Sequence, residues 1–121
     1  MVVATATILV ALGTTPRYYS TGLTFAAAKT AGLSVREVVP LNTVGSLLHA
    51  DEYTGWAKWI VDNESDKLLG ATFVGRDAAD LLHASTVAIT GGVTLRRLVH
   101  AVPSFPTMSD VYVSLIDAAV A

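Results

Sequence analysis

The chain has 121 residues, enough for one domain around one core and too few for two comfortable domains. Hydrophobic residues make up 52% of it and charged residues only 15%, against about 25% charged in an average protein. This composition excludes intrinsic disorder, and the scarcity of charge indicates apolar surface that a partner covers. A net charge of −2, with no basic run longer than Arg96-Arg97, argues against nucleic-acid binding. The absence of cysteine excludes disulfides and thiolate chemistry, and it fits a cytoplasmic protein.

The first third of the chain predicts two strands and a short helix. Val2–Leu12 is the most apolar stretch, but it is shorter than the about 20 residues of a membrane span and lacks a basic leader. Its β-branched content favours a strand, so we expect neither a membrane segment nor a secretory signal. Tyr18–Leu23 predicts a second strand. Thr24–Ala31 predicts a helix, with Thr24 as its N-cap and Gly32 at the left-handed position after its end.

The middle of the chain predicts a β-hairpin. Val35–Leu41 is rich in β-branched residues and predicts a strand, and Asn42–Thr54 has the composition of a loop. Two further apolar runs, Gly55–Asp62 and Leu68–Val74, are joined by the polar turn Asn63–Lys67, which is typical of a hairpin.

The first hairpin strand has a tryptophan on each face. Alternation places its residues in two sets, Trp56, Lys58 and Ile60 on one face and Ala57, Trp59 and Val61 on the other. We expect one face to meet the core and the other to be covered by something else.

The last third predicts helices. Asp77 can cap a helix that ends at Gly91-Gly92, and Thr94 can cap a shorter helix, Leu95–His100. The inward positions of the first helix follow i, i+3, i+4 spacing: Ala78, Leu81, Leu82, Ser85, Ala88 and Ile89.

A rigid turn, Pro103–Thr107, precedes the last predicted helix, Met108–Ala119. Thr107 with Asp110 forms a weak capping box at its start. The apolar stripe of this helix comprises Met108, Val111, Tyr112, Leu115 and Ala119. Strands first and helices mostly later predict an α+β fold, an antiparallel β-sheet with helices packed on one side.

The residues by themselves indicate no self-contained active site. The three histidines lack the spacing of a metal site: His49, His83 and His100. The acidic residues of the hairpin turn fit a solvated turn better than a cation site: Asp62, Glu64 and Asp66. Asp77 and Asp80 fit a helix N-terminus, which favours carboxylates. Gly70–Gly75 matches neither a phosphate loop nor the G-x-G-x-x-G pattern, and no Gly-x-Ser-x-Gly turn is present. We therefore expect no catalytic residue and no metal site.

Six segments, in order, resemble one known family. They are Gly13–Thr24 (family pattern "FTDPEVASVGLT"), Gly55–Trp59 ("G-[FWY]-x-K-[LIVW]"), Leu68–Gly75 ("[IL]-L-G-A-x-[IVF]-V-G"), Ala78–Leu82 ("A-x-[ED]-[LM]-[IL]"), Ala88–Thr94 ("A-[IL]-x-x-G-[LVM]-T") and Phe105–Asp110 ("H-P-T-x-[ST]-E"). The chain resembles the C-terminal dimerisation domain of the pyridine nucleotide-disulfide oxidoreductases, the flavoenzyme family of glutathione reductase, dihydrolipoamide dehydrogenase and mercuric reductase. The resemblance covers residues 14 to 121.

The resemblance implies a homodimer in which the "H-P-T…E" turn enters the partner's active site. In this chain that turn comprises Pro103, Ser104, Phe105, Pro106, Thr107 and Asp110. Phe105 stands at the position of the family's histidine, and Asp110 at that of its glutamate. Because phenylalanine cannot transfer a proton, the acid/base role toward a redox dithiol is not carried over. Mercuric reductase-like enzymes also lack this histidine, so the difference is compatible with the family.

The resemblance also implies which residues meet the partner: Leu81 and His83 on the helix within Asp77–Thr90, and Phe105 with Pro106 in the turn. The Phe105–Pro106 bond is expected to be cis, as in the family. The FAD and NAD(P) domains of the family are absent, so we expect a domain of a longer flavoenzyme that neither binds FAD tightly nor turns over substrate alone. The alternatives are a free-standing homodimeric interaction protein and a small-ligand-binding α+β protein that uses the Trp56 or Trp59 face.

Overall fold

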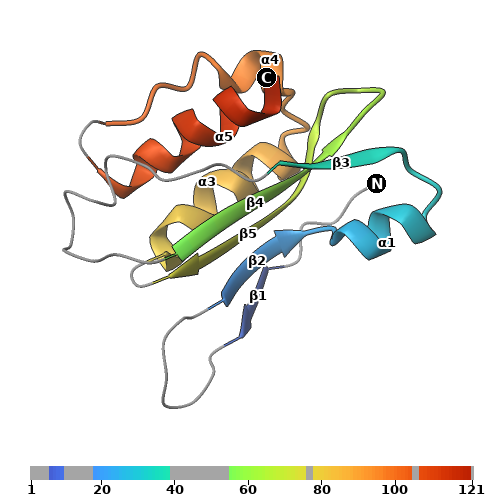
Figure 1. Cartoon of the computed structure of the whole chain (residues 1–121), viewed down its shortest axis with the longest axis horizontal. Helices are drawn as coiled ribbons and strands as arrows, with labels where there is room; N and C mark the ends of the chain where they lie inside the picture. The colour runs from blue at the N-terminus through green and yellow to red at the C-terminus, as the bar shows by residue number, and fades with distance from the viewer. Residues whose placement is uncertain (1–5, 10–17, 39–54, 76–77, 105–106, 121) are drawn as a thin grey trace.

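The computed structural model describes residues 6–9, 18–38, 55–75, 78–104 and 107–120. These residues form a five-stranded sheet with the order β1-β2-β5-β4-β3, and every neighbouring pair is antiparallel (Figure 1). The strands are β1 (Ala6–Leu9), β2 (Tyr18–Gly22), β3 (Val35–Val38), β4 (Gly55–Asp62) and β5 (Leu68–Gly75). The helices are α1 (Phe25–Thr30), α3 (Ala79–Thr90), α4 (Leu95–Leu98), the 3-10 turn η1 (Met108–Asp110) and α5 (Val111–Val120).

The predicted hairpin is the centre of the sheet. Strands β4 and β5 pair from Gly55 opposite Gly75 to Val61 opposite Leu68. Asp66 adopts a φ of +61° in the connecting turn, and its amide donates to the Asp62 carbonyl at 2.9 Å. Asp and Asn tolerate this left-handed conformation better than most residues, which explains how the polar turn closes.

The main core lies between one face of the sheet and the helices α3, α4 and α5 (Figure 1). Trp59 and Phe73 are its largest fully buried side chains, and each ring centroid lies 5.7 Å from that of Tyr112 on α5. All six predicted inward positions of α3 are buried, and the predicted stripe of α5 faces the core, joined there by Ile116. The i, i+3, i+4 pattern therefore predicted the packed faces of both helices.

A second, smaller core lies on the opposite face of the sheet. Ala28 of α1 packs there with Val35, Ile60 and Leu69. The expectation that helices pack on one side holds for α3, α4 and α5, whereas α1 covers the other face. Ile60 and Leu69 alternate with Val61 and Leu68 along their strands, so their side chains point away from the main core and need a cover of their own.

Most predicted helix ends are confirmed. The Thr24 hydroxyl accepts from the Ala27 amide at 3.0 Å, and Gly32 has a φ of +78°. Thr94 caps α4 by accepting from the Arg97 amide at 3.3 Å, although α4 ends at Leu98 rather than His100. Gly91 is the C-cap of α3, and Ala78 is its N-cap, without a side-chain cap hydrogen bond. The predicted cap, Asp77, lies outside the described residues.

The predicted capping box of the last helix is wrong. The Thr107 side chain makes no cap hydrogen bond; its hydroxyl donates to the Ser104 carbonyl at 2.5 Å. The Asp110 amide instead donates to the Thr107 carbonyl at 3.0 Å, which closes η1. A 3-10 turn satisfies the first amides through the backbone, so the side-chain cap is not needed there.

Parts of the predicted strands and loops lie outside the described residues. Of the expected strand over residues 2–12, only β1 is described, and the expected strand from Val35 is described as far as Val38. The loop predicted for residues 42–54 is not described. In the described ranges no helix is long and apolar enough to cross a membrane.

Candidate functional site

The predicted active-site turn runs from the end of α4 toward the start of α5. Ser104 and Thr107 are exposed and linked by the Thr107 hydroxyl bond, and Pro103 and Asp110 are half-buried. Phe105 and Pro106 lie outside the described residues, and with them the expected cis bond. The described residues of this turn are linked by the Thr107 hydroxyl bond and by the Asp110 amide bond to the Thr107 carbonyl, and they lead directly into α5.

The two interface residues predicted on α3 lie on different sides of it. Leu81 is 6% exposed and belongs to the main core, so it supports the helix from inside and offers little surface to a partner. His83 is exposed, and so is Val87, one turn later, at 56%. The helical period decides this difference, because residues two positions apart point about 200° from each other.

A buried chain of hydrogen bonds joins β4, α3 and α5. Trp59 Nε1 donates to Ser85 Oγ at 3.4 Å, and Ser85 Oγ lies 2.8 Å from the Tyr112 hydroxyl. The Tyr112 hydroxyl donates to the Leu81 carbonyl by a short bond. The sequence pattern predicted inward positions for Ser85 and Tyr112 and left open which tryptophan face meets the core. It carried no signal for the contacts, since Trp59 and Ser85, like Ser85 and Tyr112, lie more than 25 residues apart.

The electrostatics of this cluster favour neutral groups. Burial raises the pKa of Tyr112 to about 12, and the Ser85 hydrogen bond opposes that rise only in part. Tyr112 is therefore protonated and donating at neutral pH. Both histidines in the described parts of the chain, His83 and His100, are exposed, and His49 lies outside them. In those same parts no three His, Asp or Glu side chains gather as metal ligands would.

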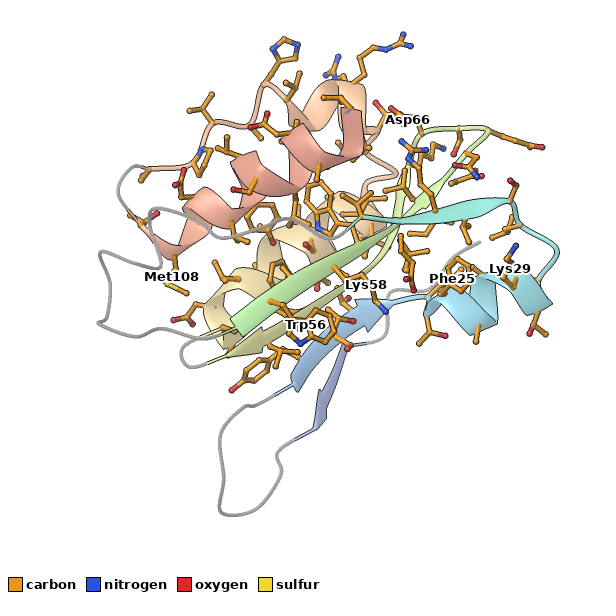
Figure 2. The ribbon with its side chains drawn as sticks, viewed as in Figure 1. Phe25, Lys29, Trp56, Lys58, Asp66 and Met108 are labelled. Carbon is orange, nitrogen blue, oxygen red and sulfur yellow. The ribbon has the colours of Figure 1, made fainter. Side chains whose placement is uncertain are left out.

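The opposite face of β4 carries the exposed tryptophan (Figure 2). Trp56 is 42% exposed, whereas Trp59 is fully buried and unavailable to a ligand. Lys58 Nζ lies 5.9 Å from the centroid of the Trp56 ring and 3.2 Å from a carboxylate oxygen of Glu37. Beside this pair, Ser20 and Thr72 are joined through their hydroxyls at 3.1 Å. Around Trp56 this face therefore combines an exposed aromatic ring with paired polar side chains, while farther along β4 Ile60 packs under α1.

Residues 10–116 match a family model described as "Pyridine nucleotide-disulphide oxidoreductase, dimerisation domain". The chain belongs to this family. The resemblance found in the motifs is thereby confirmed, and the chain is a dimerisation domain of this type. Its α+β fold, built on an antiparallel sheet, is likewise confirmed by solved structures.

Relatives of this dimerisation domain include mercuric reductases and dihydrolipoyl dehydrogenases. It is 35% identical over 98 residues to a mercuric reductase of Staphylococcus aureus, and the aligned region covers 80% of this chain and 18% of the relative. It is 29% identical over 106 residues to a dihydrolipoyl dehydrogenase of Bacillus subtilis, and the aligned region covers 87% of this chain and 23% of the relative. The chain thus spans about a fifth of the length of these relatives.

Solved structures with the same fold include an NAD-dependent persulfide reductase from A. fulgidus and a water-forming NADH oxidase from Lactobacillus brevis. Each is 22% identical to the dimerisation domain, with a TM-score of 0.81. The match to the persulfide reductase covers 98% of this chain and 22% of the reductase chain. The match to the NADH oxidase covers 95% of this chain and 26% of the oxidase chain. At this identity the likeness shows the fold alone.

Proposed function

We propose that the chain pairs with a second copy of itself and serves as the interface domain of a FAD- and NAD(P)H-dependent oxidoreductase of the cytoplasm. The observation that carries the proposal is the family match over residues 10–116. The mercuric reductase and dihydrolipoyl dehydrogenase relatives support an oxidoreductase parent. The chain alone then has no catalytic activity, and flavin and nucleotide are held by other parts of the parent enzyme.

The pairing surface in this proposal is the outer face of α3 together with the turn over residues 103–110. The exposed side chains of α3 include one carboxylate and no lysine or arginine: Ala79, Asp80, His83, Ala84, Val87 and Thr90. Few charges must lose water when such a face is covered, and depletion of charge is typical of interface centres. Val87 provides the exposed apolar contact and His83 a hydrogen-bonding group beside it.

The turn defines what the parent can do at the partner's active site. Phe105 occupies the position at which the family's histidine transfers a proton, and phenylalanine has no titratable group. In this proposal the turn therefore shapes and encloses the partner's site through Pro103, Ser104, Phe105, Pro106 and Thr107, while proton transfer is left to other groups. Asp110 holds the position of the glutamate that orients the family's histidine.

The pairing is tested with two charged substitutions on opposite faces of the domain. Val87→Arg places a charge on the outer face of α3. Ala26→Arg places one at an exposed position of α1, the helix that covers the other face of the sheet. We expect the unmodified chain and Ala26→Arg to sediment as dimers at tens of micromolar, and Val87→Arg as a monomer. Monomeric unmodified chain, or equal behaviour of the two variants, would contradict the proposal.

Cofactor binding is tested on the chain itself by flavin fluorescence. We expect titration of FAD with the chain to leave the fluorescence and its polarisation unchanged, because the residues that hold the cofactor belong to other domains. Saturable quenching would show that this chain carries a flavin site of its own and that the division of roles proposed here is wrong.

A further inference from the structure

The Tyr112 hydroxyl links the start of α5 to the inward side of α3. It hydrogen-bonds to Ser85 Oγ and to the Leu81 carbonyl, both on α3, while Tyr112 itself is the second residue of α5, directly after the turn. We propose that Tyr112 is a positioning residue, whose hydroxyl sets where Ser104 and Thr107–Asp110, the described part of the turn next to α5, lie relative to α3. This inference rests on the proposed function, since it concerns the surface named there.

The direction of each hydrogen bond follows from the number of protons available. Tyr112 has a single hydroxyl proton and donates it to the Leu81 carbonyl, so toward Ser85 it can only accept. Ser85 must then donate to Tyr112 and accept from the indole N–H of Trp59. The result is one ordered series, from Trp59 through Ser85 and Tyr112 to Leu81, in which each bond polarises the next.

Helix α3 presents one acceptor and one donor to this one side chain, the Leu81 carbonyl and the Ser85 hydroxyl. Leu81 and Ser85 are four residues apart, so the Leu81 carbonyl and the Ser85 side chain lie one turn apart on the same face. The Tyr112 ring is also held from the sheet side, with its centroid 5.7 Å from both Trp59 and Phe73. Apolar contact alone allows a helix to slide or rotate slightly, whereas two directed hydrogen bonds at the hydroxyl define one position.

The turn inherits this position through the backbone. Tyr112 lies two residues after Asp110, whose amide closes η1 on the Thr107 carbonyl, and Thr107 is bonded in turn to Ser104. A shift at the start of α5 therefore moves Thr107 and Ser104 with it. Because α3 and the turn must meet the same partner at once, an error in their relative position weakens pairing even when each remains folded.

The experiment compares Tyr112→Phe with Thr21→Val in the full chain. Both substitutions remove a largely buried hydroxyl that is bonded to α3, since Thr21, 2% exposed, accepts from Thr86 Oγ1 at 3.0 Å. Thr21 ties α3 to β2, however, whose neighbours in the sheet are β1 and β5. Urea unfolding, sedimentation equilibrium and hydrogen exchange at the Asp110 amide are measured for each variant.

We expect similar losses of unfolding stability from both variants and different effects on pairing. Tyr112→Phe should raise the dimer dissociation constant about tenfold, because pairing must then fix a turn position that the hydrogen bond no longer holds, at a cost similar to that of one such bond. It should also speed exchange of the Asp110 amide. Thr21→Val should leave both within about twofold of the unmodified chain, which is the scatter usual for substitutions at independent sites.

The outcomes separate this inference from the proposed function. Equal dissociation constants and equal Asp110 exchange in the two variants would overturn the positioning role while leaving dimerisation intact. If the unmodified chain is monomeric, the proposed function fails, and the Asp110 exchange then decides the positioning role by itself: faster exchange in Tyr112→Phe alone supports it, and equal exchange refutes it.

Discussion

The carbonyl oxygen of Leu23 occupies the space that a side chain on Gly70 would need. The Leu23 amide also donates to the Leu69 carbonyl at 2.9 Å, so the backbone leaving β2 lies directly against β5. The neighbouring pair in this register, Gly22 opposite Gly70, is glycine on both strands. The glycine of the Leu-Leu-Gly-Ala segment is therefore explained by close approach of two backbones.

Gly70→Ala should destabilise the fold severely, by about 3 kcal/mol or more, because backbone rather than a flexible side chain must move. Gly32→Ala is the matched control: its φ of +78° makes alanine strained, but nothing lies within 4 Å of the added carbon. We expect that variant to lose only about 1 kcal/mol. Urea unfolding of both, with equal losses, would contradict this explanation.

Asp66 combines a left-handed backbone with two links to other elements. Its carboxylate lies 2.9 Å from the Arg36 guanidinium on β3, and its carbonyl accepts from the Leu95 amide at the start of α4 (Figure 2). Asp66→Asn keeps the tolerance for positive φ and an oxygen toward Arg36, so we expect a loss of at most about 0.5 kcal/mol. Asp66→Ala removes both and should lose about 1 to 2 kcal/mol in thermal or urea unfolding. Indistinguishable variants would show that neither property matters there.

The raised pKa of Tyr112 predicts how stability changes in alkali. The folded pKa is about 12 and the usual value is 10.0, so above pH 10 the unfolded chain loses this proton first. The free energy of unfolding therefore falls as the pH rises from about 10 to 12, and the contribution of Tyr112 is fully present only below this range. Tyr112→Phe lacks that dependence, so its stability should approach that of the unmodified chain as the pH rises. The free energy of unfolding of both proteins is measured in urea at pH 9, 10 and 11. A constant difference between them across this range would contradict the predicted role of the Tyr112 pKa.

The hairpin turn predicts a smaller effect in acid. The Ser65 hydroxyl donates to Asp62 at 2.6 Å and is the main cause of the lowered pKa of that carboxyl, helped by the Glu64 amide. Asp62 thus contributes stability above its ordinary pKa and loses it as the pH falls through the lowered value. Ser65→Ala should raise the Asp62 pKa toward its ordinary value, as followed by carboxyl-carbon NMR titration. An unchanged pKa would assign the shift to other groups.

The local features of this chain were predictable from its sequence. The hairpin over Gly55–Gly75, the caps at Thr24 and Thr94 and the inward face of α3 depend on residues close together in the chain. Hydrophobic periodicity, helix capping and turn formation depend on residues four or five positions apart, so the sequence alone predicts these features. The ordered motifs that identify the family are legible for the same reason.

The long-range features needed the tertiary structure. The sequence placed all helices on one side of the sheet, but only the packing of Ala28 with Ile60 and Leu69 shows where α1 lies. It proposed Leu81 and His83 together for the interface, and the fold buries one and exposes the other. The Tyr112 links to α3 and the approach of Leu23 to Gly70 join residues 27 to 47 positions apart. Such contacts depend on how the helices and strands pack against one another. A hydrophobic pattern with a period of two or 3.6 residues predicts which face of an element is buried, but not which distant residue it meets.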